Sequence, residues 1–136
     1  MPAYRPIDSG IPLKASASDL VNFRWRRDGI SADFAFPDER LLRVTFDRPC
    51  IVRLLDEMPL STEEDGPVSG LVADHFAYEL SGASFERMQS EMWKEVWKLQ
   101  LGSMHHFRFV TGGGCMDVIS PAQPTFLIVA RSAEPN

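Results

Sequence analysis

Short segments in which polar and apolar residues alternate make up most of this chain, and they constrain its fold more than any other feature. Successive side chains of a β-strand point to opposite faces, so this alternation predicts antiparallel strands with one buried face. The segments expected to form strands are 20–27, 30–36, 42–46, 50–55, 72–80, 105–111 and 115–120. A further segment, 125–131, is apolar on both faces and predicts a strand that is covered on each side.

Turn-forming residues separate these segments. Asp28-Gly29 predicts a hairpin turn, and Arg48-Pro49 predicts a second hairpin that joins 42–46 to 50–55. Residues 112–114 are three glycines, and they predict a hairpin turn with positive φ angles, which glycine adopts without steric cost. The glycine run precedes neither Lys-Ser nor Lys-Thr and does not open a helix, so we do not expect a phosphate-binding loop.

One segment, 84–102, follows a helical period instead of a strand period. Its apolar residues recur at spacings of three and four, which places them on one stripe of an α-helix. The stripe consists of Phe85, Met88, Met92, Val96 and Leu99. Ser84 is suited to cap the start of this helix and Gly102 to end it. We expect one long helix whose apolar stripe is buried in the core.

About eight strands and one long helix, without a repeating β-α-β order, predict the fold class. We expect an α+β protein, with a β-rich antiparallel sheet or half-open barrel and the helix packed against it. The 136 residues fit a single domain spanning 1–136. Residues 1–19 have little periodicity and are expected to wrap the surface or stay mobile. Asp56–Gly70 is predicted to be an irregular loop that is either functional or mobile.

Composition excludes several classes of partner. The formal net charge of −5 argues against nucleic-acid binding, although Arg24, Arg26 and Arg27 alternate with Phe23 and Trp25 as in some stacking strands. No segment is apolar over the length of a membrane span, and the first residues lack the pattern of a signal peptide. We therefore expect a cytoplasmic protein that binds neither nucleic acid nor membrane.

A pair of tryptophans is the best sequence clue to function. Trp93 and Trp97 are one helical turn apart and lie beside the apolar stripe, so they predict a single aromatic ledge. Such ledges are enriched at protein interfaces and at the rims of apolar pockets. We predict a non-enzymatic binding module that uses Trp93, Trp97, Phe76 and Tyr78. Its expected partner is another protein, including a second copy as a homodimer, or a small apolar ligand.

The histidines provide an alternative prediction. His75, His105 or His106, together with Asp117 or Cys115, would suit a small enzyme or a metal-binding protein. Adjacent His105 and His106 must point to opposite faces of a strand, so they cannot share one site. No HxH, HExxH or CxxC motif is present. We therefore predict no metal, no cofactor and no catalytic residue, and we expect both cysteines to be small buried residues.

Overall fold

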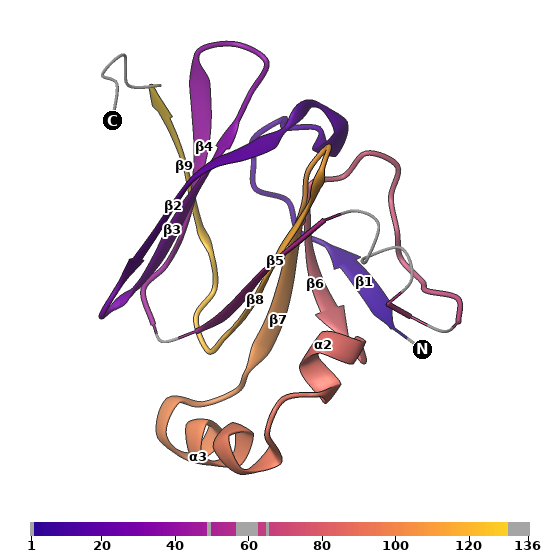
Figure 1. Ribbon diagram of the computed structural model, residues 1–136, viewed down its shortest axis with the longest axis vertical. Helices are drawn as coiled ribbons and strands as arrows, with labels where there is room; N and C mark the ends of the chain where they lie inside the picture. Colours follow the sequence, from indigo (N-terminus) through magenta and orange to yellow (C-terminus); the bar gives the residue numbers. More distant parts are fainter. Residues whose placement is uncertain (1, 49, 57–62, 65, 131–136) are drawn as a thin grey trace.

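A computed structural model describes residues 2–48, 50–56, 63, 64 and 66–130 of the chain. The described residues form nine strands in two antiparallel sheets that pack face to face as a sandwich (Figure 1). The first sheet has the order β1 (Ala3–Pro6), β6 (Ala77–Ser81), β7 (His105–Val110), β8 (Gly114–Ser120) and β5 (Ile51–Asp56). The second has the order β2 (Asp19–Arg26), β3 (Gly29–Ala35), β4 (Arg40–Phe46) and β9 (Thr125–Ala130).

The antiparallel, β-rich α+β architecture is confirmed, but the half-open barrel is wrong because the strands divide between two sheets. The predicted hairpin between β4 and β5 is also wrong. β4 pairs with β3 and β9, whereas β5 pairs with β8 in the opposite sheet. Each of the two strands has one apolar face, and placing them in facing sheets buries both faces together.

The core between the sheets is built from aromatic residues on the inward faces of the strands. Phe34 of β3 and Phe46 of β4 contact phenylalanines of the opposite layer and are almost completely buried. The ring centroids of Phe34 and Phe76 lie 4.9 Å apart, and those of Phe46 and Phe107 lie 5.5 Å apart. Burying each such side chain stabilises the fold by roughly 1.5–3 kcal/mol. These contacts hold the two sheets together.

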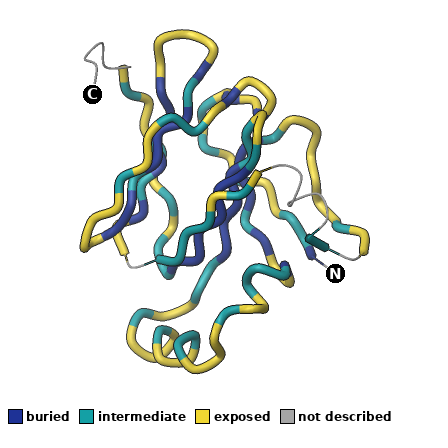
Figure 2. Tube along the Cα trace, in the orientation of Figure 1, coloured by how far each residue is buried: buried dark blue, intermediate teal, exposed yellow. Residues whose placement is uncertain are grey.

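The outer face of the five-stranded sheet is also buried, although its side chains are polar. His106, Arg108 and Asp117 point away from the inter-sheet core, and none of them is more than 1% exposed. Figure 2 shows the buried trace of this sheet in the middle of the molecule, with the segment that contains α2 next to one end of it. The sequence predicted strands with only one buried face, so it did not predict this second buried layer.

The single long helix is wrong in its extent. The segment forms α2 (Ser84–Arg87) and α3 (Glu91–Leu101), and a separate 3₁₀ turn, η1 (Ala15–Ala17), precedes β2. Ser90 has a non-helical backbone, and its hydroxyl accepts a hydrogen bond from the backbone N–H of Trp93. Serine therefore caps α3 in the middle of the predicted helix. Gly102 ends α3 as predicted.

Three further expectations differ from the structure. Strand structure begins at Ala3, well before Leu20, because β1 pairs with β6. The strand expected over 72–80 is shorter, since β6 begins at Ala77. Strand β9 lies at a sheet edge and is largely exposed, so the expectation that both of its faces are covered is wrong. Of the predicted loop, residues 57–62 and 65 lie outside the described residues.

The hairpin of β7 and β8 is confirmed, but the positive φ angles expected in its turn are wrong. Among the described glycines, positive φ occurs at positions 10, 29, 70, 82 and 102, and not at 112–114. The Thr111 hydroxyl accepts hydrogen bonds from the backbone N–H groups of Gly113 and Gly114 and thereby holds the turn. In the described part of the chain, no helix has both the length and the apolar character needed to cross a membrane.

Candidate functional site

Helix α3 presents the apolar stripe predicted for the core to solvent instead. Met92 is 80% exposed, Val96 44% and Leu99 87%. Figure 1 shows α3 at one end of the molecule, away from both sheets, and Figure 2 shows how exposed the helix is. The assignment of this stripe to the core is therefore wrong. A periodic apolar pattern shows that residues share a helix face, but it does not show what covers that face.

The two predicted ledge residues lie on the more buried side of α3. The rings of Trp93 and Trp97 pack on each other, with centroids 4.8 Å apart and an angle of 52° between their planes. Both side chains are half-buried. On the same side, Lys94 Nζ donates to the carbonyl oxygen of Glu86 across 3.4 Å, which connects α3 to α2. The ledge exists as a structural unit, and its use for binding stays a prediction.

The structure does not bring Phe76 and Tyr78 to this ledge. Phe76 lies in the inter-sheet core, whereas Tyr78 belongs to a separate buried cluster with Leu80 and Ala83. The Tyr78 ring packs edge-on against Tyr4, with centroids 5.1 Å apart. Phe76 and Tyr78 therefore lie in two different clusters, and β6 begins after Phe76.

The three histidines occupy three different environments. His75 Nε2 lies 3.0 Å from the carbonyl oxygen of Ile7, and His105 Nδ1 lies 2.9 Å from Glu79 Oε2. His106 alone approaches the predicted acidic partner, Asp117. The opposite orientation of His105 and His106 is confirmed. Within the described residues, no three His, Cys, Asp or Glu side chains converge as a metal site would require.

Asp117 is the centre of a buried charge cluster that the sequence interpretation found only in part. The strand register places Asp117 of β8 directly between Arg53 of β5 and Arg108 of β7. Asp117 Oδ1 accepts from His106 Nε2 and from Arg108 Nε, each across 2.7 Å. Asp117 Oδ2 accepts from Arg53 Nη2 across 2.8 Å. Both oxygens of this carboxylate therefore accept hydrogen bonds from protein donors.

The edges of this cluster are closed by residues from distant segments. Glu63 forms an ion pair with Arg53, and Arg108 Nη1 donates to the hydroxyl of Tyr4 across 2.5 Å. The ring of Phe85, in α2, covers the Arg53 guanidinium at 4.2 Å from its centroid. Next to Glu63, Glu64 accepts from the backbone N–H and the hydroxyl of Ser84, at the start of α2. The carboxylates of Glu63 and Glu64 thus connect residues 63–64 to the outer face of the sheet and to the start of α2.

The electrostatics of the cluster keep its carboxylates ionised. Burial alone would raise the pKa of Asp117, but the hydrogen bond from His106 and the charge of Arg108 outweigh it, so this pKa lies well below its usual range. The hydrogen bond from Arg53 similarly lowers the pKa of Glu63. Ionised carboxylates paired with two arginines form a stable arrangement inside a protein only when their hydrogen bonds are satisfied, as they are here.

This geometry does not support the nucleophilic chemistry considered for Cys115. Its sulfur lies 3.7 Å from Asp117 Oδ2, and burial followed by the negative charge of Asp117 raises the pKa of the thiol to about 12. A protonated thiol is a poor nucleophile. Asp117 holds His106 through Nε2, but His106 Nδ1 has no hydrogen-bond partner among the described residues, so this histidine does not contact the Cys115 thiol as a base would. The cluster ties three strands together rather than presenting a reactive group.

Arg53, Glu63 and Arg108 are the members of this cluster that sequence reasoning missed. Each of the strands β5, β7 and β8 carries one charged residue among apolar ones on its outward face. Such a charge is a detectable signal for a buried ion pair. Recognising it would have required the pairing of β5 and β7 with β8, and the pairing of β5 with β8 joins residues more than 50 positions apart.

An apolar cleft lies where the edges of the two sheets approach each other. It has a volume of about 250 Å³ and is lined by Phe23, Trp25, Ile30, Cys50 and Val52. β2 and β5 are the edge strands of their sheets, so no further strand among the described residues closes this side of the sandwich. Trp25 is 82% exposed although it lies on the inward face of β2.

Comparisons with models of protein families, with curated proteins and with solved structures give no significant match for this chain.

Proposed function

We propose that this protein is a non-enzymatic binding module that self-associates through helix α3. The observation that carries the proposal is the exposure of Met92, Val96 and Leu99 on a helix that stands away from both sheets (Figure 1). A contiguous apolar stripe in water is costly, and its burial against a partner is favourable. The half-buried Trp93 and Trp97 border this stripe on one side, so the predicted aromatic ledge would adjoin the same interface.

The charges of α3 favour a second copy as the partner, in antiparallel orientation. At about 100° per residue, Glu91 and Lys98 lie together on the flank of the stripe opposite the tryptophans. When two identical helices pack antiparallel, the same flank of each helix meets. Glu91 of one copy, which is exposed and also pairs with Lys94 of its own helix across 3.0 Å, would then lie beside Lys98 of the other. This pair would occur twice by symmetry. A parallel arrangement would not bring these charges together.

The size of α3 limits the strength of this association. Its 11 residues span about 16 Å at the usual helical rise. Such a surface falls below the roughly 800 Å² per partner of a standard stable interface. We therefore expect a weak, concentration-dependent dimer with a dissociation constant on the order of micromolar or weaker.

Sedimentation analysis over a wide concentration range tests this proposal. The wild-type protein should shift from monomer to dimer as its concentration rises, and Met92→Ser with Leu99→Ser should abolish the shift. Leu127→Ser is the matched control, because Leu127 is an exposed leucine on β9. A wild-type protein that stays monomeric at hundreds of micromolar would overturn the proposal, as would a double variant that dimerises normally.

The orientation is tested separately by reversing charges. Lys98→Glu should weaken the dimer by placing it against Glu91 of the other copy, and adding Glu91→Lys should restore association. Failure of the second substitution to restore it, with helix content unchanged by circular dichroism, would contradict the antiparallel arrangement.

A small apolar ligand is the second candidate function, and the cleft between β2 and β5 favours it. Its lining is mostly apolar and includes Trp25, whose fluorescence would report binding directly. 1-anilinonaphthalene-8-sulfonate, an aromatic anion that binds apolar surfaces, should shift the Trp25 emission, and Val52→Phe should block the cleft without adding a fluorescent tryptophan. An identical response in wild-type and Val52→Phe proteins would exclude this cleft as the binding site.

A further inference from the structure

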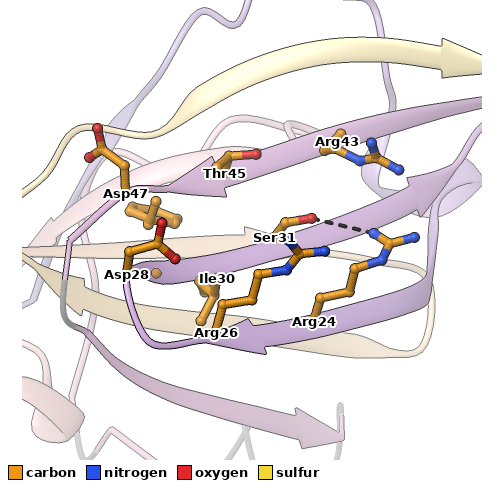
Figure 3. Close-up of a pocket in the computed structure, with 10 residues that line it drawn as sticks. Arg24, Arg26, Asp28, Ile30, Ser31, Arg43, Thr45 and Asp47 are labelled. Carbon is orange, nitrogen blue, oxygen red and sulfur yellow. Dashed lines mark hydrogen bonds between the residues drawn. The ribbon is translucent and has the colours of Figure 1, made fainter.

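A second hollow lies on the outer face of the four-stranded sheet, remote in sequence from α3. It has a volume of about 400 Å³ and lies above strands β2, β3 and β4 near their shared end (Figure 3). The hollow exists because the residues at its centre, on β3 and β4, have short side chains or none. Gly29, Ser31 and Thr45 form its floor, whereas long side chains surround them.

Gly29 keeps this floor open for a steric reason. Its φ of +151° is unusual for residues with a side chain, and a Cβ there would collide with the carbonyl oxygen of Phe46 on the neighbouring strand. Position 29 therefore requires glycine, and the space above it stays free of protein atoms from this residue.

A completely buried carboxylate positions two of the surrounding arginines. Asp33 is 0% exposed and accepts hydrogen bonds from Arg43 Nε across 2.8 Å and from Arg24 Nη1 across 3.1 Å. Burial would raise the pKa of Asp33, but the hydrogen bonds from Arg43 and Arg24 outweigh this effect and lower it. Asp33 is therefore ionised, and it fixes both guanidinium groups before any ligand arrives.

The positive charge at this end of the hollow exceeds the negative charge. Arg24, Arg26 and Arg43 carry three positive charges against the single charge of Asp33. The side chain of Arg26 forms no hydrogen bond or ion pair with the residues that the structure describes, although its backbone belongs to the β2–β3 pairing. Figure 3 shows the head group of Arg26 pointing to the same end as that of Arg24. An unpaired guanidinium beside two fixed ones is suited to bind a carboxylate in two-pronged geometry.

The opposite end of the hollow is negative. Asp28 and Asp47 line it there, and Figure 3 shows both carboxylates at the end away from Arg24 and Arg43. Arg43 and Asp47 are four positions apart along the chain, so their Cα atoms are about 13 Å apart in an extended strand. The hollow thus has two ends of opposite charge. Because the arginine and aspartate side chains reach inward from these ends, both could contact one small ligand whose charged groups are several bonds apart.

We propose that this hollow binds a small dipolar ligand whose carboxylate and ammonium groups are separated by several bonds. The carboxylate would lie against Arg24 and Arg26, and the ammonium group would lie between Asp28 and Asp47. Ser31 and Thr45 would contribute hydroxyls between the two ends. The acidic end disfavours a polyanion, and Phe23 and Trp25 lie on the opposite face of β2 from these arginines, so no stacking surface for nucleic acid is formed.

Calorimetric titration with three matched compounds tests this proposal: 6-aminohexanoate, hexanoate and hexylammonium. We expect 6-aminohexanoate to bind about tenfold more tightly than either singly charged compound, since only it satisfies both ends. Arg26→Ala should weaken 6-aminohexanoate binding by about tenfold, because it removes a guanidinium group that would contact the ligand carboxylate. The fold should not change, since Arg26 does not pair with Asp33. Arg27→Ala, which changes an adjacent arginine outside the hollow, should leave the affinity unchanged.

Asp47→Asn gives an independent readout, because it should remove the preference for 6-aminohexanoate over hexanoate without abolishing hexanoate binding. Backbone amide shifts should move at Gly29, Ser31 and Thr45. Equal affinities for the three compounds, no binding at tens of millimolar, or an unaffected Arg26→Ala variant would overturn the proposal. The titration also applies to the Met92→Ser, Leu99→Ser variant, so its result does not depend on self-association.

Discussion

His106 Nε2 donates a hydrogen bond to Asp117 Oδ1 across 2.7 Å, in a place where neither side chain is exposed. Because Asp117 is ionised, this nitrogen must carry the proton, and the buried Nδ1 of His106 then has no partner among the described residues. The two residues lie on adjacent strands, β7 and β8, diagonal to each other rather than opposite. The histidine therefore stabilises a carboxylate that also holds Arg53 and Arg108.

Removal of the Asp117 carboxylate should destabilise the protein strongly. Asp117→Ala would leave Arg53 and Arg108 with Glu63 as their remaining charged partner, and Arg108 is only 1% exposed. Breaking a buried ion pair in this way costs about 3–5 kcal/mol. Urea unfolding measures the loss. Asp38→Asn provides the control, because that carboxylate is exposed and its ion pair with Arg40 lies on the surface. Equal midpoints for the two variants would contradict the structural role of Asp117.

Acid should destabilise the protein through the same carboxylates. The pKa values of Asp33, Asp117 and Glu63 are lowered in the folded state. A lowered pKa stabilises the fold above the unfolded-state value of about 4, and this stabilisation is lost as the pH falls toward the folded-state value. The urea midpoint should therefore hold between pH 7 and pH 5 as far as these groups are concerned, and decline below about pH 4.

The control for this pH dependence is Asp117→Asn, which should show a shallower decline because one of the three groups no longer titrates. A wild-type midpoint that is the same at pH 3 as at pH 6 would show that these pKa values are not lowered by folding.

The strands were predictable because their signal is local. The alternation in 42–46 and 50–55 fixes which side chains share a face, and the structure confirms both strands. The partner of each strand is not a local property. Val52 pairs with Val118, far along the chain, and nothing in residues 50–55 distinguishes that pairing from one with β4.

The helix illustrates the same limit at the candidate site. The 3.6-residue period correctly groups Met92, Val96 and Leu99, but it cannot specify whether sheet, solvent or another chain covers them. The serine at position 90 was a readable signal for a break, since serine is a strong N-cap. The hollow above Gly29 was not predictable, because its floor comes from three strands whose register sets which short side chains meet.

The revised position of the apolar stripe leads to a clear stability prediction. Met92→Ala should change the free energy of unfolding by less than about 0.5 kcal/mol, as substitutions at exposed positions usually do. Leu42→Ala, by contrast, should cost about 2–5 kcal/mol, because Leu42 is completely buried between the sheets. The two variants are to be compared at low protein concentration, where self-association does not contribute. A large loss for Met92→Ala in the monomer would place the stripe back in the core.

Alanine substitution should have different effects at two neighbouring positions of the glycine turn, Gly113 and Gly114. Gly114 starts β8 opposite Asp56, and a Cβ there would collide with the carbonyl oxygen of Leu55. Gly113 has no atom near the position of its missing Cβ and does not have positive φ. Gly114→Ala should therefore lower the thermal midpoint, while Gly113→Ala should leave it unchanged. The reverse order would indicate that the β5–β8 register at this end differs from the one described.

The last prediction concerns the two thiols and separates the binding module from the small enzyme. Burial raises the pKa of Cys50 to about 11, and burial together with the charge of Asp117 raises that of Cys115 to about 12. A nucleophilic cysteine needs the opposite shift, since the thiolate is the reactive form. Iodoacetamide at pH 8 should therefore modify neither residue in the folded protein and both in denaturant, as mass spectrometry would show. Cys50→Ser isolates Cys115, and rapid, stoichiometric modification of Cys115 in that folded variant would revive the enzyme hypothesis.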